Sequence, residues 1–260
     1  MPNQDTDDLG LGDVFEASPS PPPPEPTIAY YDLDSPVEGS ERGPRLTIRL
    51  VGSHPLWGHY LWNSGICLAK YLEHNPTLYA GSNVLELGAG GGLPALVTAL
   101  RGAKKTVISD YPDRALVENI EVNVERNVPE KERSEVAVLG YVWGADTTPL
   151  LSTISPSRYF DLVLLSDLIF NHSQHEALLK SCELLTDPHP QSDQPSVLVF
   201  YTHHRPHLAE KDLDFFRLAE SRGWICDKFF VEQKEAMFAD DPGDVVVRST
   251  VHGWKLRRPI

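Results

Sequence analysis

The glycine-rich segment at residues 84–94 reads Val84-Leu85-Glu86-Leu87-Gly88-Ala89-Gly90-Gly91-Gly92-Leu93-Pro94. The apolar run that ends at Leu87 predicts a buried strand, and Pro94 suits the first turn of a following helix. The glycines allow a tight turn and a close approach of the backbone to a ligand. A strand, a glycine turn and a helix in this order are typical of nucleotide-binding sites in α/β proteins.

The glycine spacing distinguishes between kinds of nucleotide site. The dinucleotide fingerprint needs glycine at its first, third and sixth positions, but Leu93 stands at the sixth position counted from Gly88. The loop also has no Lys-Ser or Lys-Thr pair, which a phosphate-binding loop requires. The pattern is instead Glu86-x-Gly88-x-Gly90-x-Gly92. A purely structural glycine turn is the alternative, because short glycine motifs also occur by chance.

Strand-like and helix-like patterns alternate along most of the chain, which predicts a parallel sheet with helices on both faces. Two β-rich runs at residues 224–231 and 245–256 come last, and the short connection between them favours an antiparallel hairpin. The predicted fold class is therefore α/β, with a doubly wound, mostly parallel sheet and a C-terminal antiparallel hairpin. The other strands are expected at residues 46–50, 83–87, 106–109, 136–142, 161–166 and 197–201. Helices are expected at residues 62–72, 94–100, 114–126 and 208–222. A further helix is expected to begin at a capping box formed by Ser173 and Glu176.

The first 43 residues differ in composition from the rest. Ten of the 37 acidic residues lie in residues 1–41, which contain no Lys or Arg, and six of the eight residues from Pro19 to Pro26 are proline. Such a segment has too little apolar surface to offset the entropy lost on ordering. We expect a disordered, acidic, Pro-rich tail at residues 1–43, more plausibly a solvated linker than a ligand for a partner domain, and one folded domain at residues 44–260.

The net charge of −14 comes mostly from this tail, since the remaining residues include 27 acidic and 23 basic side chains. This part lacks the basic balance of a protein that binds nucleic acid. Its apolar runs are too short to span a bilayer, and the three cysteines form no C-x-x-C pair, as in proteins of reducing compartments. We expect a cytoplasmic monomer that binds neither nucleic acid nor a membrane.

A second acidic position supports a nucleoside site. The strand after the glycine loop ends in Ser109-Asp110, twenty-two residues beyond Gly88. An acid at the carboxyl end of this strand can accept hydrogen bonds from both hydroxyls of a ribose. The alternative is that Asp110 caps the helix that follows Pro112.

These motifs resemble the seven-β-strand methyltransferases that use S-adenosylmethionine, and the resemblance implies a seven-stranded, Rossmann-like class I fold. Within that class the chain is similar to the family 16 protein methyltransferases. The similarity extends from Arg45 to Trp254. The family segments are Leu61-Trp62-Asn63-Ser64-Gly65, Tyr141-Val142-Trp143-Gly144 and Ser166-Asp167-Leu168-Ile169-Phe170-Asn171.

The resemblance implies S-adenosylmethionine as the cofactor. Asp110 would hold the ribose, Glu86 would attract the ammonium group, and the face of Trp143 would cover adenine. For Trp62 the alternative is a core aromatic on an amphipathic helix. The implied cofactor-binding residues are Trp62, Glu86, Gly88, Ala89, Gly90, Asp110, Trp143 and Ser166.

The acid-x-x-aromatic signature implies that Asp167 and Phe170 are catalytic. Asp167 would accept hydrogen bonds from an incoming amine, and Phe170 would offer a ring face to a partly methylated cation. The alternative is that Asp167 only orders its loop.

No metal is expected. The pairs His172 and His175, and His203 and His207, have helical spacing but lack a zinc signature. The segment His203-His204-Arg205-Pro206 is a candidate for contact with substrate, because it follows a strand at the same edge of the sheet.

Within the family, the segments at residues 55–59, 109–113, 166–172 and 204–206 are most similar to those of fungal enzymes that methylate the N-terminal α-amine and the adjacent lysine of translation elongation factor 1-alpha. The resemblance therefore implies that protein as the substrate. An α-amine, with a pKa of about 7.7–8.0, loses its proton more readily than a lysine at about 10.4 and is the better first substrate. Three alternatives are open: a methyltransferase for a small amine such as nicotinamide, a non-catalytic scaffold that binds the cofactor, and an oxidoreductase that uses a dinucleotide.

Overall fold

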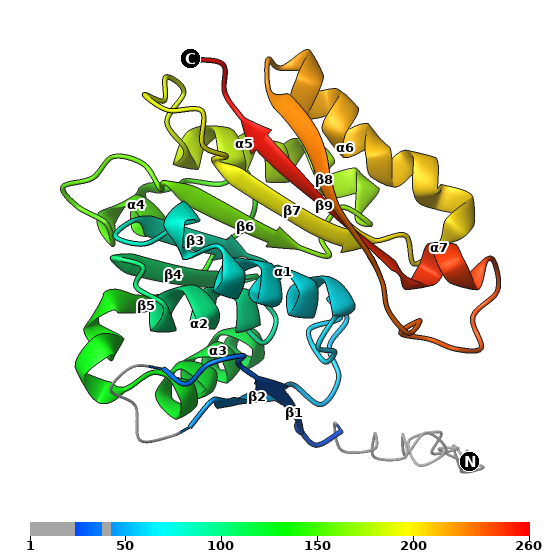
Figure 1. The fold of residues 1–260 in the computed structure, drawn as a ribbon, viewed down its shortest axis with the longest axis horizontal. Helices are drawn as coiled ribbons and strands as arrows, with labels where there is room; N and C mark the ends of the chain where they lie inside the picture. The colour runs from blue at the N-terminus through cyan, green and yellow to red at the C-terminus, as the bar shows by residue number, and fades with distance from the viewer. Residues whose placement is uncertain (1–23, 38–42) are drawn as a thin grey trace, which may run out of the picture.

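The computed structural model describes residues 24–37 and 43–260. A seven-stranded sheet in the order β5-β4-β3-β6-β7-β9-β8 runs through its centre (Figure 1). The first five strands in that order are parallel, and β9 is antiparallel to both of its neighbours, as the sequence predicts. The strands are β3 (Asn83–Leu87), β4 (Lys105–Asp110), β5 (Val136–Gly140), β6 (Leu162–Ser166), β7 (Val197–Thr202), β8 (Ile225–Gln233) and β9 (Thr250–Arg257).

Helices cover both faces of the sheet. Alternate residues of a strand point to opposite faces, so Val84 packs in one apolar cluster with α1, α2 and α3, whereas Leu85 and Leu87 pack in a second cluster with α4, α5 and α6. The helices are α1 (Asn63–His74), α2 (Leu93–Leu100), α3 (Arg114–Asn127), α4 (Thr148–Ser152), α5 (His175–Leu185), α6 (Ala209–Ser221) and α7 (Val245–Ser249), with 3-10 turns at Pro76–Leu78, Glu130–Glu135, His172–Gln174 and Pro206–Leu208.

The chain reverses its direction of strand addition between β3 and β6. Strand β3 pairs with β4 on one side and with β6 on the other, and Leu87 lies opposite Leu165. The loops that follow these strands therefore meet at the carboxyl edge of the sheet, where α/β proteins bind ligands. No helix among the residues described is long and apolar enough to cross a membrane.

The predicted boundary of the tail at residue 43 is wrong for residues 27–37. Residues of β1 (Thr27–Asp32) pair antiparallel with β2 (Arg45–Leu50), and Leu33 and Val37 are buried. Figure 1 shows this small sheet beside α3, away from the main sheet. Composition misses the strand because the apolar partners of this segment come from distant parts of the chain. Residues 1–23 and 38–42, with most of the Pro-rich segment, lie outside the described residues.

Asparagine side chains of α3 attach β2 to the domain. The Asn123 amide accepts from the Arg49 backbone N–H at 2.7 Å and donates to the Arg49 carbonyl at 2.8 Å. Asn127 forms the same pair of bonds with Thr47, at 2.8 and 3.0 Å. One turn of helix separates the two asparagines, so both amides face β2 and satisfy backbone groups that an edge strand would leave free.

Two local predictions are wrong. The capping box at Ser173 does not form, because the Ser173 hydroxyl donates to Asn171 and α5 begins at His175 without a side-chain cap. Residues 245–249 form α7 rather than the start of a strand. The Asp244 side chain accepts a hydrogen bond from the Val246 N–H, and this cap starts a helical turn before β9 begins.

Candidate active site

The glycine loop after β3 is held against the end of β4. The N–H of Ala89 donates to the Ser109 carbonyl at 3.0 Å. Gly88 has a φ of +59°, and a Cβ at this position would lie 2.7 Å from Cδ2 of Leu168 and 3.1 Å from Cζ2 of Trp143. Only glycine fits both this conformation and this space. Residues 88–90 are half-buried, so their backbone is accessible.

Asp110 pins the loop from the neighbouring strand. Its Oδ2 accepts from the Gly90 N–H and its Oδ1 from the Tyr111 N–H, both at 2.7 Å. Burial raises the pKa of this carboxyl, and the two backbone N–H groups offset part of that rise. Asp110 does not cap α3, because Asp113 does so by accepting from the Ala115 N–H.

Glu86 lies beneath α2 and away from the surface of the loop. Its side chain is 1% exposed, and Oε2 accepts from the Ala95 N–H at 2.9 Å in the first turn of α2. Oε1 has no hydrogen-bond partner in the described part of the chain. Burial raises the pKa of Glu86 to about 8, against the lowering effect of the Ala95 bond. The structure does not bring this carboxyl to the loop surface.

Asp167 follows β6 and is the centre of a buried polar network. Its φ of +54° is uncommon for a residue other than glycine. Oδ2 accepts from the Ser64 hydroxyl at 2.6 Å, and Oδ1 accepts from the Thr202 N–H and from Nε2 of His204, both at 3.1 Å. The carboxyl is 5% exposed, so three internal donors occupy most of its capacity.

The network ties Ser166 and Phe170 to other elements. The hydroxyls of Ser64 and Ser166 lie 3.2 Å apart, which joins the first turn of α1 to the end of β6. The Phe170 carbonyl accepts from Nη2 of Arg205 at 2.9 Å, and this bond connects the loop after β6 to the segment after β7.

An aromatic rim, formed by Tyr60, Trp62 and Phe238, borders His204. The ring centroids of Trp62 and His204 lie 4.9 Å apart, those of Tyr60 and Trp62 5.3 Å, and those of Tyr60 and Phe238 5.2 Å. All of these rings are half-buried. Trp62 is therefore part of a partly open wall beside Asp167 rather than a core aromatic.

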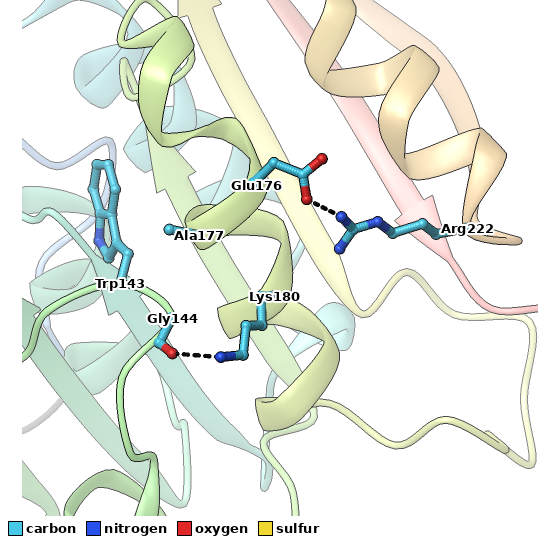
Figure 2. A pocket seen from close by; sticks show the side chains of 6 residues that line it. All are labelled: Trp143, Gly144, Glu176, Ala177, Lys180 and Arg222. Atoms are coloured by element: carbon cyan, nitrogen blue, oxygen red, sulfur yellow. Dashed lines mark hydrogen bonds and ion pairs between the residues drawn. The ribbon is translucent and has the colours of Figure 1, made fainter.

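Two cavities are lined by segments near the site. One, of about 390 Å3, is lined by Trp143 and Gly144, by three residues of α5 and by Arg222 (Figure 2). In it Lys180 donates to the Gly144 carbonyl at 2.9 Å and Arg222 pairs with Glu176. Trp143 thus lies beside Gly88, where its Cζ2 would be 3.1 Å from an added Cβ, and also lines this cavity. The second, of about 360 Å3, is lined by Ser53, His54, Pro55, Trp57 and His59.

The structure brings together one histidine from each of the two pairs that the sequence spacing suggested. Nε2 of His172 and Nδ1 of His203 both contact the buried Asp212 carboxylate, at 2.7 and 2.6 Å. Across residues 24–37 and 43–260, no group of three or more His, Cys, Asp or Glu side chains could hold a metal ion.

Sequence reasoning missed several residues of this site. Ser64 was within a family segment but had no assigned role, and Leu168 stands next to Asp167. Tyr60 and Phe238 carried no signal, because only the folded chain brings residue 238 to the start of α1.

The site fits S-adenosylmethionine. A position where only glycine fits, accessible loop backbone, a buried acid on the next strand and an aromatic ring against Gly88 suit a nucleoside with a charged side chain. Strand order and site together define the seven-stranded class of S-adenosylmethionine-dependent methyltransferases.

Solved structures support the fold. SMU.776, determined in complex with SAH, has a TM-score of 0.55 at 12% identity, over 81% of this chain and 53% of that one. Pyrococcus horikoshii TYW2, in complex with MeSAdo, has a TM-score of 0.52 at 13% identity, over 90% and 72%.

The family model described as "Lysine methyltransferase", methyltransferase family 16, matches residues 41–222, and the chain belongs to this family of enzymes. Two relatives are named "Protein N-terminal and lysine N-methyltransferase EFM7". That of Cryptococcus neoformans is 45% identical over 98% of this chain and 90% of its own length, and that of Schizosaccharomyces pombe is 44% identical over 98% of both. These matches do not favour the small-amine and scaffold alternatives.

Proposed function

We propose that this enzyme methylates the N-terminal α-amine and the adjacent lysine of translation elongation factor 1-alpha, in the cytoplasm. The observation that carries the proposal is the identity of 44–45%, over nearly the whole chain, to relatives named as N-terminal and lysine methyltransferases. The target protein is supported by the similarity of segments such as Pro55-Leu56-Trp57-Gly58-His59 to the fungal enzymes.

We propose that the cofactor lies across the carboxyl edge of β3 and β4. When bound, S-adenosylmethionine supplies a methyl group on a positively charged sulfur, which is a good leaving group. Asp110 would accept the ribose hydroxyls, and Trp143 would cover adenine. The remaining contacts would come from Gly88, Ala89, Gly90, Trp62 and Ser166, whereas Glu86 would act indirectly, through its hydrogen bond to the first turn of α2.

The protein's main tasks are then to align the amine and to exclude water. Asp167 would place negative charge beside the amine, and Phe170 would face the cation that forms as methyl groups are added. The buried network around Asp167 holds this charge in place, because Ser64 and the Thr202 backbone each donate to it.

The test is transfer of label from radioactive S-adenosylmethionine to purified elongation factor 1-alpha or to nicotinamide. We expect label on the N-terminal residue and the next lysine, located by mass spectrometry. Label on nicotinamide alone would overturn the proposal, and cofactor binding by calorimetry without any labelled protein would indicate a scaffold.

The variant Asp167→Asn tests the proposed role of Asp167. Asparagine keeps the size of the side chain and tolerates positive φ, so the loop is retained. We expect a large loss of turnover with unchanged calorimetric affinity for the cofactor. Unchanged turnover would remove Asp167 from the mechanism.

A further inference from the structure

His204 lies between a buried carboxylate and a partly open aromatic wall. Its Nε2 is 3.1 Å from Oδ1 of Asp167, and its ring meets Trp62 edge to face. A carboxylate only accepts hydrogen bonds, so Nε2 carries the proton and the lone pair of the neutral ring is on Nδ1. In the residues described, Nδ1 takes part in no hydrogen bond, and the side chain is 15% exposed.

His204 lies beside Trp62 of the aromatic rim, and its side chain is partly exposed, so an incoming amine can reach it. Asp167 is crowded by its three donors, so the carboxylate can act on an amine more readily through His204 than directly. Trp62 of the aromatic rim meets the same ring, and Tyr60 and Phe238 pack against Trp62, so the rim adds no charge beside His204. A cationic amine in this place would meet aromatic faces and one proton acceptor.

We infer that His204 is the catalytic base that deprotonates the substrate ammonium, with Asp167 as the residue that orients its ring. In this step an N–H bond of the ammonium breaks and the proton bonds to Nδ1 of His204. The electron pair stays on the substrate nitrogen, which is then free to accept a methyl group. The imidazolium is balanced by Asp167 and releases its proton to solvent after transfer. The inference rests on the proposed function only in one respect, which is the identity of the substrate amine.

The electrostatics of the site agree with this role. Burial disfavours the charged ring, but the charge and hydrogen bond of Asp167, with a smaller effect of Asp212, outweigh burial and raise the pKa of His204. Arg205, in the same loop, opposes the rise. Trp62, which meets the ring just before α1 begins, and Ser64 of α1, which shares Asp167 with it, are uncharged. The charges around His204 therefore favour the protonated ring, which is the form that the proton transfer produces.

The experiment compares His204→Gln with His207→Gln, an exposed histidine three residues away. The glutamine amide can still donate to Asp167 but cannot accept a proton. With an N-terminal peptide as substrate, we expect His204→Gln to lower kcat/KM at pH 7 by about 100-fold or more. His207→Gln should behave as wild type.

The pH profile separates a base from a structural residue. A free α-amine has a pKa of about 7.7–8.0, so at pH 9.5 it no longer needs a base. The deficit of His204→Gln should then shrink to less than about tenfold. An equal deficit at every pH, or none at pH 7, would overturn the inference.

A measurement without substrate or cofactor tests the same step. Nitrogen-15 spectra of the wild-type protein should show the neutral His204 ring with the proton on Nε2, assigned by comparison with His204→Gln. A proton on Nδ1 would overturn the inference, whether or not elongation factor 1-alpha is the substrate. Failure of the proposed function would instead appear as absent labelling of that protein, with the ring unchanged.

Discussion

The Asp110 carboxylate accepts a hydrogen bond from the backbone N–H of Gly90 at 2.7 Å. This bond joins the acid at the end of β4 to the glycine loop after β3, so the two parts of the nucleoside motif form one unit. The loop is therefore shaped before a ligand arrives, which lowers the entropy lost on binding.

We expect Asp110→Asn to weaken S-adenosylmethionine binding by about 10- to 100-fold, because charge-assisted hydrogen bonds contribute about 1.5–3 kcal/mol. The amide also places a donor against a backbone N–H. Calorimetric titration measures the affinity. The control is Asp113→Asn, since asparagine caps helices as well as aspartate does and α3 should stay intact. Equal affinity in the two variants would contradict the assignment of Asp110.

Gly88→Ala tests the close packing of the loop. The added Cβ would clash with Leu168 and Trp143, at a cost of about 1–3 kcal/mol on top of the cost of positive φ, about 1–2 kcal/mol. Gly81→Ala is a matched control, because Gly81 has a φ of +73° and no atom within 4 Å of an added Cβ. Urea denaturation should show the greater loss for Gly88→Ala, and calorimetry should show weaker cofactor binding for that variant alone.

Glu86 predicts a pH dependence of stability. Burial raises its pKa from the ordinary 4.5 to about 8, so the folded chain keeps a proton that the unfolded chain releases within this window. The contribution of Glu86 to the free energy of unfolding should thus be largest below pH 4.5 and fall as pH rises toward 8, by up to about 1.4 kcal/mol per pH unit.

Glu86→Gln removes this titration and can still accept from the Ala95 N–H. The stability of the variant relative to wild type should therefore increase from pH 5 to pH 8, as measured by urea denaturation. A constant difference across that range would mean that Glu86 is charged in the folded protein.

The asparagine contacts between α3 and β2 predict a stability effect far from the active site. Asn123→Ala leaves backbone groups of Arg49 and the Gly91 carbonyl without their partners, so the free energy of unfolding should fall by about 2–3 kcal/mol. The exposed Glu121→Ala in the same helix should change it by less than about 0.5 kcal/mol. Similar losses in both would show that the helix alone, and not its attachment to β2, is affected.

Local patterns were enough to predict most of the sheet. The apolar run before Gly88 and the glycines themselves specify a strand and a turn within eleven residues, and Asp110 follows from the next strand. Local patterns gave wrong predictions where a nearby side chain formed a hydrogen bond that the pattern does not include. Ser173 bonds to Asn171 instead of capping α5, and Asp244 starts a helical turn in a run that favours a strand by composition.

The amino-acid order alone settled the α/β class, the glycine loop and its acid, because each depends on residues that are close in the chain. Folding settled the surroundings of Asp167, because Ser64 and His204 lie 103 and 37 positions away from it. It also placed β1 on the domain and Glu86 under α2. Burial and hydrogen-bond partners are properties of packed elements, and no single segment contains the information on which elements it will meet.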